Sequence, residues 1–374
     1  MEMRVIFFFV ATWCFSFISC NRGGAEDYTP YGGDTLTCHA QLLTIVEHPK
    51  FTIVDIADPW HEAKRLQRYI LVNRNNPMPE KYPKGVVVKV PLQSSVIYSS
   101  VHADVAVEIG AAQAITGIAD AQYHKTPEIV SAMDNGKIID VGASMSPSVE
   151  RIVEMSPEAI FASPYQNAGY GVIEKLGIPI IECADYMEAN PLGRAEWIKL
   201  FGVLYGKQKV ANEIFDNVCD NYNTLVGLTV NIKGRPMVIS EMMTNGVWFV
   251  PGGRSYMAQL FQDAGADYPW RDDTSNGSLQ LTFEAVYDKA HDADYWLIKT
   301  FGNDLTLDRL KADYSLHAEM KAFNRGGVYS CNTATTTLFE DFPFHPDLLL
   351  QEYINIFHPN LLPDGKLRYF KNIR

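Results

Sequence analysis

A long amphipathic segment near the middle of the chain constrains the fold more than any other feature. Across residues 207–228, apolar side chains recur at spacings of four and three, which is the stripe of an α-helix. The residues of this stripe are Val210, Ile214, Val218, Tyr222 and Leu225. At about 1.5 Å per residue, such a helix approaches about 30 Å in length, which is enough to bridge two lobes.

Short apolar segments alternate with helical segments on both sides of this helix. Before it, the strand pattern of residues 158–163 follows the helix pattern of residues 146–157, whose initial Ser-Pro pair is expected to open the helix. After it, residues 295–300 form another strand pattern, and the tail from Leu307 onward is expected to be helical. Alternation of this kind predicts an α/β protein with mostly parallel sheets covered by helices.

The two halves of the chain contain a similar helix–strand unit. Residues 146–163 and residues 281–300 each begin with Ser or Thr and continue through a helix and an acidic turn to an apolar strand. Each unit also has a glutamate in the first turn of its helix, at Glu150 and Glu284. This weak internal repeat predicts two similar Rossmann-like lobes joined by the single long helix.

The N-terminus has the pattern of an export signal. Arg4 precedes an apolar run over residues 5–18 that is too short for a transmembrane helix but typical of a signal-peptide core. The run ends at Ser19 and Cys20, a small residue and a cysteine that resemble a lipobox. We therefore expect a lipid anchor on Cys20; the alternative is ordinary signal cleavage nearby, with this cysteine incidental.

These patterns give an expected domain organisation. The segment before the first lobe reads as short strands and turns, after a polar, glycine-rich stretch that suits a tether. The expected units are a signal peptide (1–20), a tether and β-rich extension (21–94), a first lobe (95–206), the linking helix (207–228) and a second lobe (229–374).

Composition and motifs exclude several functions. The formal net charge of −12 argues against a nucleic-acid partner, because phosphate binding needs clustered Lys and Arg. The sequence contains no GxSxG, HExxH, GxGxxG or P-loop motif, so no enzyme class is indicated. The remaining cysteines show no metal-binding spacing, and three disulfide pairings are open to them. They are Cys38, Cys183, Cys219 and Cys331.

Two segments carry a family resemblance. RIVEMSPEAIFAS at residues 151–163, and the segment from EKLGIPIIECADY to KVANEIF at residues 174–215, resemble periplasmic binding proteins with a helical backbone between their lobes. These proteins serve ABC importers of iron complexes and cobalamin. The resemblance extends from about Ser94 to Phe357.

This resemblance implies a membrane-anchored periplasmic lipoprotein that captures a metal chelate: a ferric siderophore, haem or cobalamin. It implies no catalysis and no resident cofactor or metal. The implied partners are the permease and ATPase subunits of an ABC importer, and the protein itself is expected to be a monomer. Two alternatives are an enzyme of similar architecture, such as a chelatase or metallocluster protein, and a co-receptor that senses the ligand without transport.

The resemblance also implies one acidic residue on each lobe that pairs with arginines of the transporter. The matching positions are Glu150 and Glu284. The alternative is that each glutamate only complements its helix dipole.

The ligand is expected where strand ends of the two lobes face each other. Aromatic side chains would form walls for a flat macrocycle, and arginines would grip an anionic chelate, although any one ring is also compatible with a hydrophobic core. His102 could be an axial metal ligand or simply a residue of a helix N-terminus. The candidates are Tyr98, Ser100, His102, Tyr165, Tyr170, Tyr186 and Arg194 in the first lobe, and Trp248, Phe249, Trp270 and Arg271 in the second.

Overall fold

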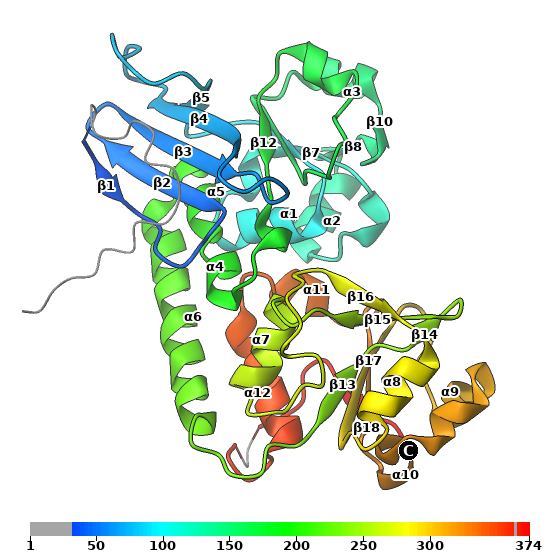
Figure 1. Cartoon of the computed structure of the whole chain (residues 1–374). Coiled ribbons are helices and arrows are strands. Elements are labelled where there is room, and N and C mark those ends of the chain that lie inside the picture. The colour runs from blue at the N-terminus through cyan, green and yellow to red at the C-terminus, as the bar shows by residue number, and fades with distance from the viewer. Residues whose placement is uncertain (1–31, 363–364) are drawn as a thin grey trace, which may run out of the picture.

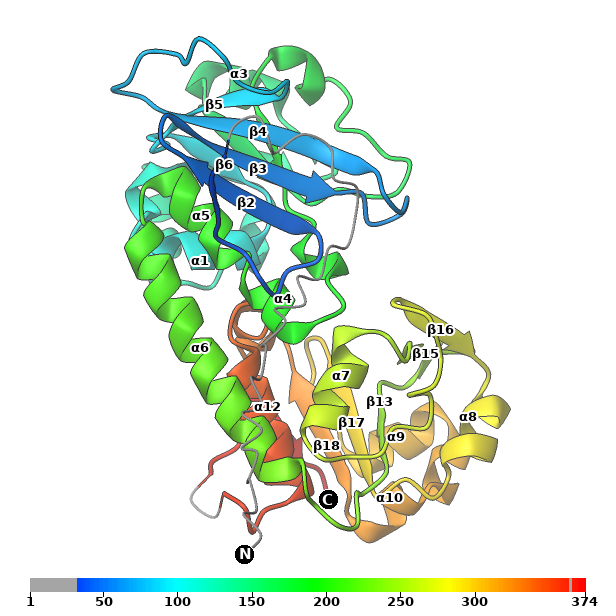
Figure 2. The ribbon, with the colours of Figure 1, turned by 60° about the vertical axis from the view of Figure 1, so that its left-hand side comes forward.

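A computed structural model describes residues 32–362 and 365–374. Two α/β lobes are connected along one side of the molecule by the long helix α6, Gln208–Thr229 (Figures 1 and 2). The predicted fold class is confirmed. The expected signal peptide and Cys20 lie outside the described residues, and none of the described helices is long and apolar enough to cross a membrane.

The first lobe is built on a five-stranded parallel sheet with the order β12-β11-β6-β7-β8. Its central strands are apolar and buried, as expected of strands covered on both faces. The strands are β6 (Ser95–Ile97), β7 (Ile115–Ile118), β8 (Ile139–Asp140), β11 (Ala159–Ala162) and β12 (Ile180–Glu182).

Helices connect the strands of this lobe, and the helix expected to open at Ser146 and Pro147 begins later. Ser146–Pro147 does not open α3 but forms the short strand β10, which pairs with β9 (Gly142–Ala143). The helix begins two residues later because the Ser148 hydroxyl caps it by accepting from the Arg151 N–H. The helices are α1 (Ser100–Glu108), α2 (Pro127–Asp134), α3 (Val149–Met155), α4 (Pro191–Ala195) and α5 (Ile198–Tyr205).

The second lobe has two sheets. Parallel strands β13 (Val238–Ser240), β17 (Tyr295–Thr300) and β18 (Val328–Asn332) pair in that order, and the short antiparallel strand β19 (Lys371–Asn372) follows β18. A small antiparallel sheet contains β14 (Met243–Thr244), β15 (Val247–Pro251) and β16 (Ser278–Leu281). The expectation of an all-helical tail is wrong, because β18 completes the parallel sheet.

Helices surround the sheets of this lobe. α8 begins at the hydroxyl cap of Thr282, as α3 does at Ser148, so the two repeat units share their local structure. The helices are α7 (Tyr256–Asp263), α8 (Phe283–Ala290), α9 (Leu307–Asp313), α10 (Lys321–Arg325), α11 (Leu338–Asp341) and α12 (Pro346–Phe357).

The segment before the first lobe forms a sheet of its own, which packs on that lobe (Figure 2). Strands β1 to β4 run antiparallel in sequence order, and β5 pairs parallel with β4. The Tyr69 hydroxyl connects this sheet to β12, because it donates to the Ile180 carbonyl at 2.6 Å and accepts from the Glu182 N–H at 2.8 Å. The strands are β1 (Asp34–Thr35), β2 (Leu43–His48), β3 (Phe51–Ala57), β4 (Arg65–Asn73) and β5 (Val86–Val90).

Two buried carboxylates hold the loop that leads into β2. Glu196 accepts from the backbone N–H groups of residues 38–40 at 2.7–3.0 Å and from the Lys199 ammonium at 2.9 Å. Glu188 accepts from the N–H groups of Gln41 and Leu42 and from the Trp197 indole. The N-terminal sheet is therefore bonded to the first lobe, beyond its apolar packing. We name this sheet with its loop, residues 34–90, the N-terminal sheet.

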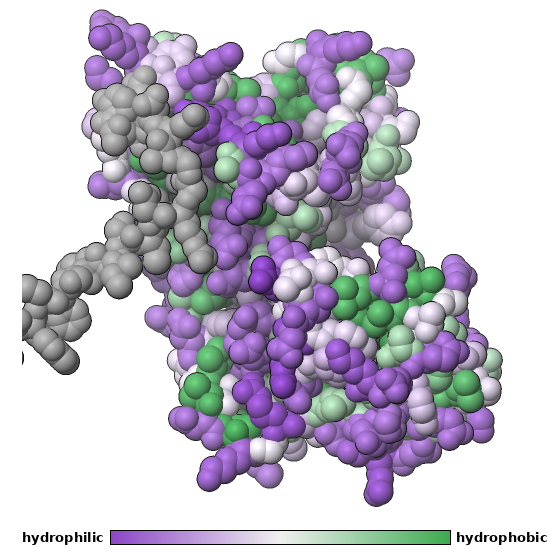
Figure 3. Space-filling view, in the orientation of Figure 1, coloured by the Kyte–Doolittle hydropathy of each residue, from purple (hydrophilic) through white to green (hydrophobic). Residues whose placement is uncertain are grey.

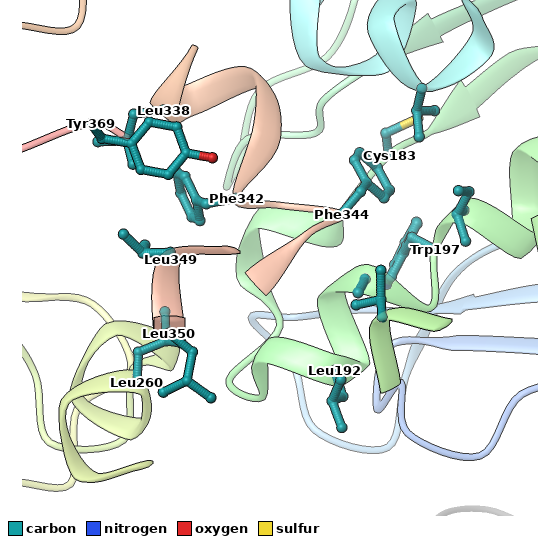
Figure 4. Packing of buried hydrophobic residues seen from close by; sticks show 14 of the residues in the cluster. Cys183, Leu192, Trp197, Leu260, Leu338, Phe342, Phe344, Leu349, Leu350 and Tyr369 are labelled. Atoms are coloured by element: carbon teal, nitrogen blue, oxygen red, sulfur yellow. The ribbon is translucent and has the colours of Figure 1, made fainter. Parts of the chain in front are cut away.

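Apolar packing continues from one lobe to the other. Figure 4 shows Phe342 and Phe344 between α11 and α12, facing the helical segment of the first lobe that carries Trp197. The Phe344 ring lies edge-on to Phe201 of α5, with centroids 6.0 Å apart. Across the same contact, His345 pairs with Glu108 of α1 at 2.9 Å. The lobes thus share a core beside the linking helix.

Candidate ligand-binding cavity

A cavity of about 1020 Å³ lies between the lobes. In the space-filling view of Figure 3, a notch separates the upper and lower halves of the molecule on the right-hand side, away from α6. This volume is at the upper end of the range for pockets that hold drug-sized ligands.

The first lobe contributes the loops that follow its parallel strands. Residues 98–100 follow β6, Asp120 and Lys125 follow β7, and Ser163 and Tyr165 follow β11. Carboxyl ends of parallel strands meet at one edge of a sheet, which is where open α/β sheets bind ligands. The cavity also takes in residues 144–147 and the loop at residues 168–173.

The second lobe contributes fewer residues, again after its strands. Phe301 follows β17, Thr333 and Ala334 follow β18, and Phe339 and Glu340 lie on α11. Lys125 joins the two sides, since its ammonium donates to the carbonyls of Thr333 at 2.7 Å and Thr336 at 3.1 Å.

Large apolar side chains with high exposure gather at this cavity. Met145 is 79 % exposed, Phe301 73 % and Tyr165 54 %. Water contact of this kind is costly, so a cluster of such groups marks a binding surface. The exposed members that line the cavity are Tyr123, Met145, Tyr165, Val172, Phe301 and Phe339.

Three tyrosines of the first lobe differ in their surroundings. Burial raises the pKa of Tyr98 to about 12, and its hydroxyl has no hydrogen-bond partner among the described residues. Burial and the neighbouring Glu182 carboxylate, to which its hydroxyl donates, raise the pKa of Tyr170. The Tyr165 ring lies tilted beside the Tyr186 ring, with ring centroids 6.4 Å apart. With their pKa values raised, Tyr98 and Tyr170 stay neutral phenols at physiological pH.

The structure brings together some of the residues expected to bind ligand. Tyr98, Ser100, Tyr165 and Tyr170 line the cavity. The other residues named from the sequence do not, and each has a different structural position.

Trp248 was expected at the cleft but belongs to the core of the second lobe. It is fully buried and stacks on Trp296, and its indole N–H donates to the Ser240 carbonyl at 3.0 Å. Phe249, its neighbour on β15, points to the opposite face and is exposed, outside the cavity lining. The sequence does not indicate which face of this strand meets the core.

Trp270 and Arg271 also lie away from the cavity lining. Trp270 is buried edge-on against Tyr268, with ring centroids 5.5 Å apart. Arg271 pairs with Asp267, one turn earlier in the chain. Both belong to a local turn that follows α7.

Arg194 and His102 belong to a buried ion-pair network with Asp185 and do not line the cavity. Asp185 accepts from His102 Nε2 at 2.8 Å and from Arg194 Nε at 3.2 Å. Burial alone would raise the pKa of Asp185, but His102 and Arg194 hold it below its usual range. The Arg194 guanidinium also lies 5.2 Å from the ring centroids of Tyr256 and Phe342 in the second lobe. Arg194 therefore connects the first lobe to the second.

Tyr186 holds a loop of the cavity without lining the cavity itself. Its hydroxyl donates to the Pro164 carbonyl, and burial raises its pKa to about 12. The ring contacts Tyr165 but is not part of the cavity lining. It positions the loop after β11.

Sequence reasoning missed the loop after β7 and the whole contribution of β18 and α11. Asp120, Lys125 and Glu340 carry the charges of the cavity lining. Asp120 and Lys125 follow β7, and their position after this short apolar segment was a usable signal. The sequence gives no such signal for Glu340, because the preceding strand β18 was not expected. The described residues contain no cluster of three His, Cys, Asp or Glu that could hold a metal ion, and their four cysteines are free.

Glu150 and Glu284 are exposed in the first turns of α3 and α8. In Figure 1 both helices lie on the side of the molecule opposite α6. Hydrogen bonding from its own N–H and from Thr282 lowers the pKa of Glu284. Both carboxylates are open to a partner.

Two parallel-sheet lobes on one linking helix, with a cavity between them, define a class III solute receptor. The family model described as "Periplasmic binding protein" matches residues 96–335, and the chain belongs to this family. The family gives the chain a substrate-binding role for an ABC importer, with a permease and a small-molecule ligand as partners.

Relatives and solved structures agree with this assignment. An uncharacterized lipoprotein of Methanocaldococcus jannaschii is 30 % identical over 81 % of this chain and 75 % of its own length. The periplasmic haem-binding protein of Vibrio cholerae has a TM-score of 0.57 at 14 % identity, over 71 % of this chain and 100 % of that one. The triscatecholate siderophore-binding protein of Bacillus subtilis, complexed with ferri-bacillibactin, has a TM-score of 0.55 at 18 % identity, over 75 % and 97 %.

Proposed function

We propose that this protein captures a metal chelate, of the ferric siderophore, haem or cobalamin class, between its lobes and delivers it to an ABC importer. The observation that carries the proposal is the cluster of exposed aromatic and apolar side chains around one large interlobe cavity. Such a surface suits a large ligand with flat or apolar faces. Structural neighbours that bind haem and a ferric siderophore support the same ligand class.

A titration of tryptophan fluorescence with haemin, cyanocobalamin and ferric siderophores tests this proposal, because these chelates absorb and quench. Tyr165→Ala and Phe301→Ala should each weaken binding by about tenfold or more. Covering a large ring stabilises a complex by roughly 1.5–3 kcal/mol, and about 1.4 kcal/mol is one decade in affinity. Val230→Ala, an equally exposed apolar position beyond α6, is the control. Absence of binding to every chelate at micromolar protein would reject the ligand class.

Docking is proposed to use Glu150 and Glu284, which would meet arginines of the permease. Charge reversal of either should abolish uptake in cells while leaving ligand affinity in solution unchanged. Glu154→Lys, an exposed change on the same helix as Glu150, is the control. Loss of affinity in both reversed variants would instead place these residues in ligand binding.

The rest of the proposal concerns cellular context. Lipoprotein relatives support export and a lipid anchor on Cys20, a residue outside the described structure. We further propose that the receptor acts as a monomer, and that the importer includes ATPase subunits beside its permease. If ligand uptake depends on Glu150 and Glu284, the protein takes part in transport, and the alternative of a co-receptor that only senses the ligand is excluded.

A further inference from the structure

The charges that line the cavity limit which chelate it can hold. Asp120, Glu340 and Lys125 are the charged residues among the described lining, and no arginine is among them. The lining therefore carries an excess of negative charge, in a chain whose formal net charge is −12. Receptors of anionic ligands need the opposite balance, since guanidinium groups bind carboxylate and similar anions in pairs of hydrogen bonds.

The only lysine of this lining already has its donors engaged. An ammonium has three N–H donors. The Lys125 ammonium donates to the carbonyls of Thr333 at 2.7 Å and Thr336 at 3.1 Å, and it lies 3.5 Å from Glu340 Oε1. Turning it toward an anionic ligand would break the contact that it makes between the lobes.

Glu340 lines the cavity and has one acceptor oxygen without a donor in the described part of the chain. Its side chain is only 10 % exposed, and its Oε2 is buried without a hydrogen-bond partner among the described residues. A buried carboxylate oxygen without a donor is unfavourable, and a donor on the ligand would remove that cost. The Tyr98 hydroxyl, on the facing lobe, is likewise buried without a partner in the described structure.

We propose that the cargo is a neutral or cationic metal chelate whose periphery donates hydrogen bonds, such as amide or ammonium N–H groups, and that Glu340 receives one of them. This inference rests on the proposed function and narrows the class of metal chelate that it names. Anionic chelates, such as haem with its propionates or ferric tris-catecholates, would face like charge with no free cation to offset it. The Tyr98 hydroxyl can donate to or accept from the same ligand, as an amide group allows.

Isothermal titration of the full mature chain with four probes tests the charge preference. Ferrioxamine B is cationic and cyanocobalamin is neutral and rich in amides, whereas haemin and ferric enterobactin are anionic. We expect ferrioxamine B or cyanocobalamin to bind at least about a hundredfold more tightly than either anionic probe. An anionic probe that binds most tightly would overturn this inference and leave the proposed function intact, while failure of all four would reject the proposed function itself.

A substitution at Glu340 tests whether this residue produces the charge preference. Glu340→Gln removes the charge but keeps an acceptor oxygen, so it should weaken the preferred probe by about tenfold or more and narrow its advantage over haemin. Glu154→Gln, outside the cavity, should change neither value. Unchanged affinity in a correctly folded Glu340→Gln variant would remove Glu340 from ligand recognition. The charge preference of the wild-type chain decides the proposal even where that variant does not fold.

Discussion

Replacement of Glu196 by alanine should separate the N-terminal sheet from the first lobe. The side chain is completely buried, and its carboxylate accepts from three consecutive backbone N–H groups at residues 38–40 and from Lys199. Truncation removes the acceptor of all four donors at once. Lys199, 11 % exposed, keeps its bond to the Leu36 carbonyl at 2.9 Å and its contact with the Phe215 ring, whose centroid lies 4.5 Å from the ammonium.

The expected cost follows from these contacts. Breaking a buried ion pair by removing one partner costs about 3–5 kcal/mol, and each backbone N–H left without a partner adds about 1–3 kcal/mol, less where water reaches it. Because the loop is half-exposed, we expect a loss of about 4 kcal/mol in the free energy of unfolding. Glu196→Gln, which keeps one acceptor oxygen, should lose about half as much.

Urea unfolding followed by tryptophan fluorescence measures this loss, and hydrogen exchange at residues 38–42 locates it. Glu213→Ala is a matched control, because Glu213 pairs with Lys209 at 3.8 Å on the exposed face of α6 and should contribute less than about 1 kcal/mol. An alanine variant within about 1 kcal/mol of the wild type, with residues 38–42 still protected, would refute the anchoring role.

The same carboxylate predicts a dependence on pH. Burial alone would raise its pKa, but hydrogen bonds from Ala40 and Lys199 lower the pKa of Glu196 below 4.5. A lowered pKa in the folded state contributes stability above pH 4.5, and that contribution disappears as the pH falls through the lowered value. Glu196→Gln should therefore lose less stability than the wild type on acidification.

Three further outcomes are expected. Burial raises the pKa of Asp104 from 3.8 to about 6, so ionisation of this carboxyl destabilises the fold as the pH rises between these values. In thermal unfolding, Asp104→Asn should be more stable than the wild type at pH 7.5 by up to about 3 kcal/mol, and this difference should disappear near pH 4. Arg194→Ala should lose about 3–5 kcal/mol of stability, because it removes the guanidinium that pairs with buried Asp185. Normal stability together with lost ligand binding would instead show that Arg194 contacts the ligand. Cys20→Ala should abolish covalent lipid detected by mass spectrometry, and a wild-type chain without lipid would exclude the anchor.

The sequence predicts the long elements better than the site. The stripe over residues 207–228, which begins directly after Gly206, locates α6 to within one residue, because amphipathic spacing and a left-handed glycine are both local signals. Strand β18 has the pattern VYSCN after two glycines, too short and too mixed in polarity to be distinguished from a loop. Its absence from the prediction removed Glu340 and its neighbours from the candidate site.

Predicted side-chain positions failed where partners are distant in sequence. Trp248 was expected at the cleft, but which face of its strand meets the core depends on Trp296 and Phe283, which lie far along the chain. Arg194 is drawn from the cleft by Asp185 in its own lobe and by rings of the other lobe. Such pairings are set by the packing of two lobes, and no local pattern encodes them.

The bonds between the N-terminal sheet and Glu196, which lies between α4 and α5, have a consequence for the order in which the chain folds. Glu196 and Cys38 are 158 residues apart, and closing a loop of that length costs about 4–5 kcal/mol of chain entropy before any contact forms. Synthesis delivers residues 34–90 long before α4 and α5, so the apolar face of this sheet has no cover while the first lobe is being made. Contacts this distant slow folding, and an uncovered sheet is prone to aggregate. The N-terminal sheet is thus synthesised before the two lobes but is among the last parts to reach its native packing.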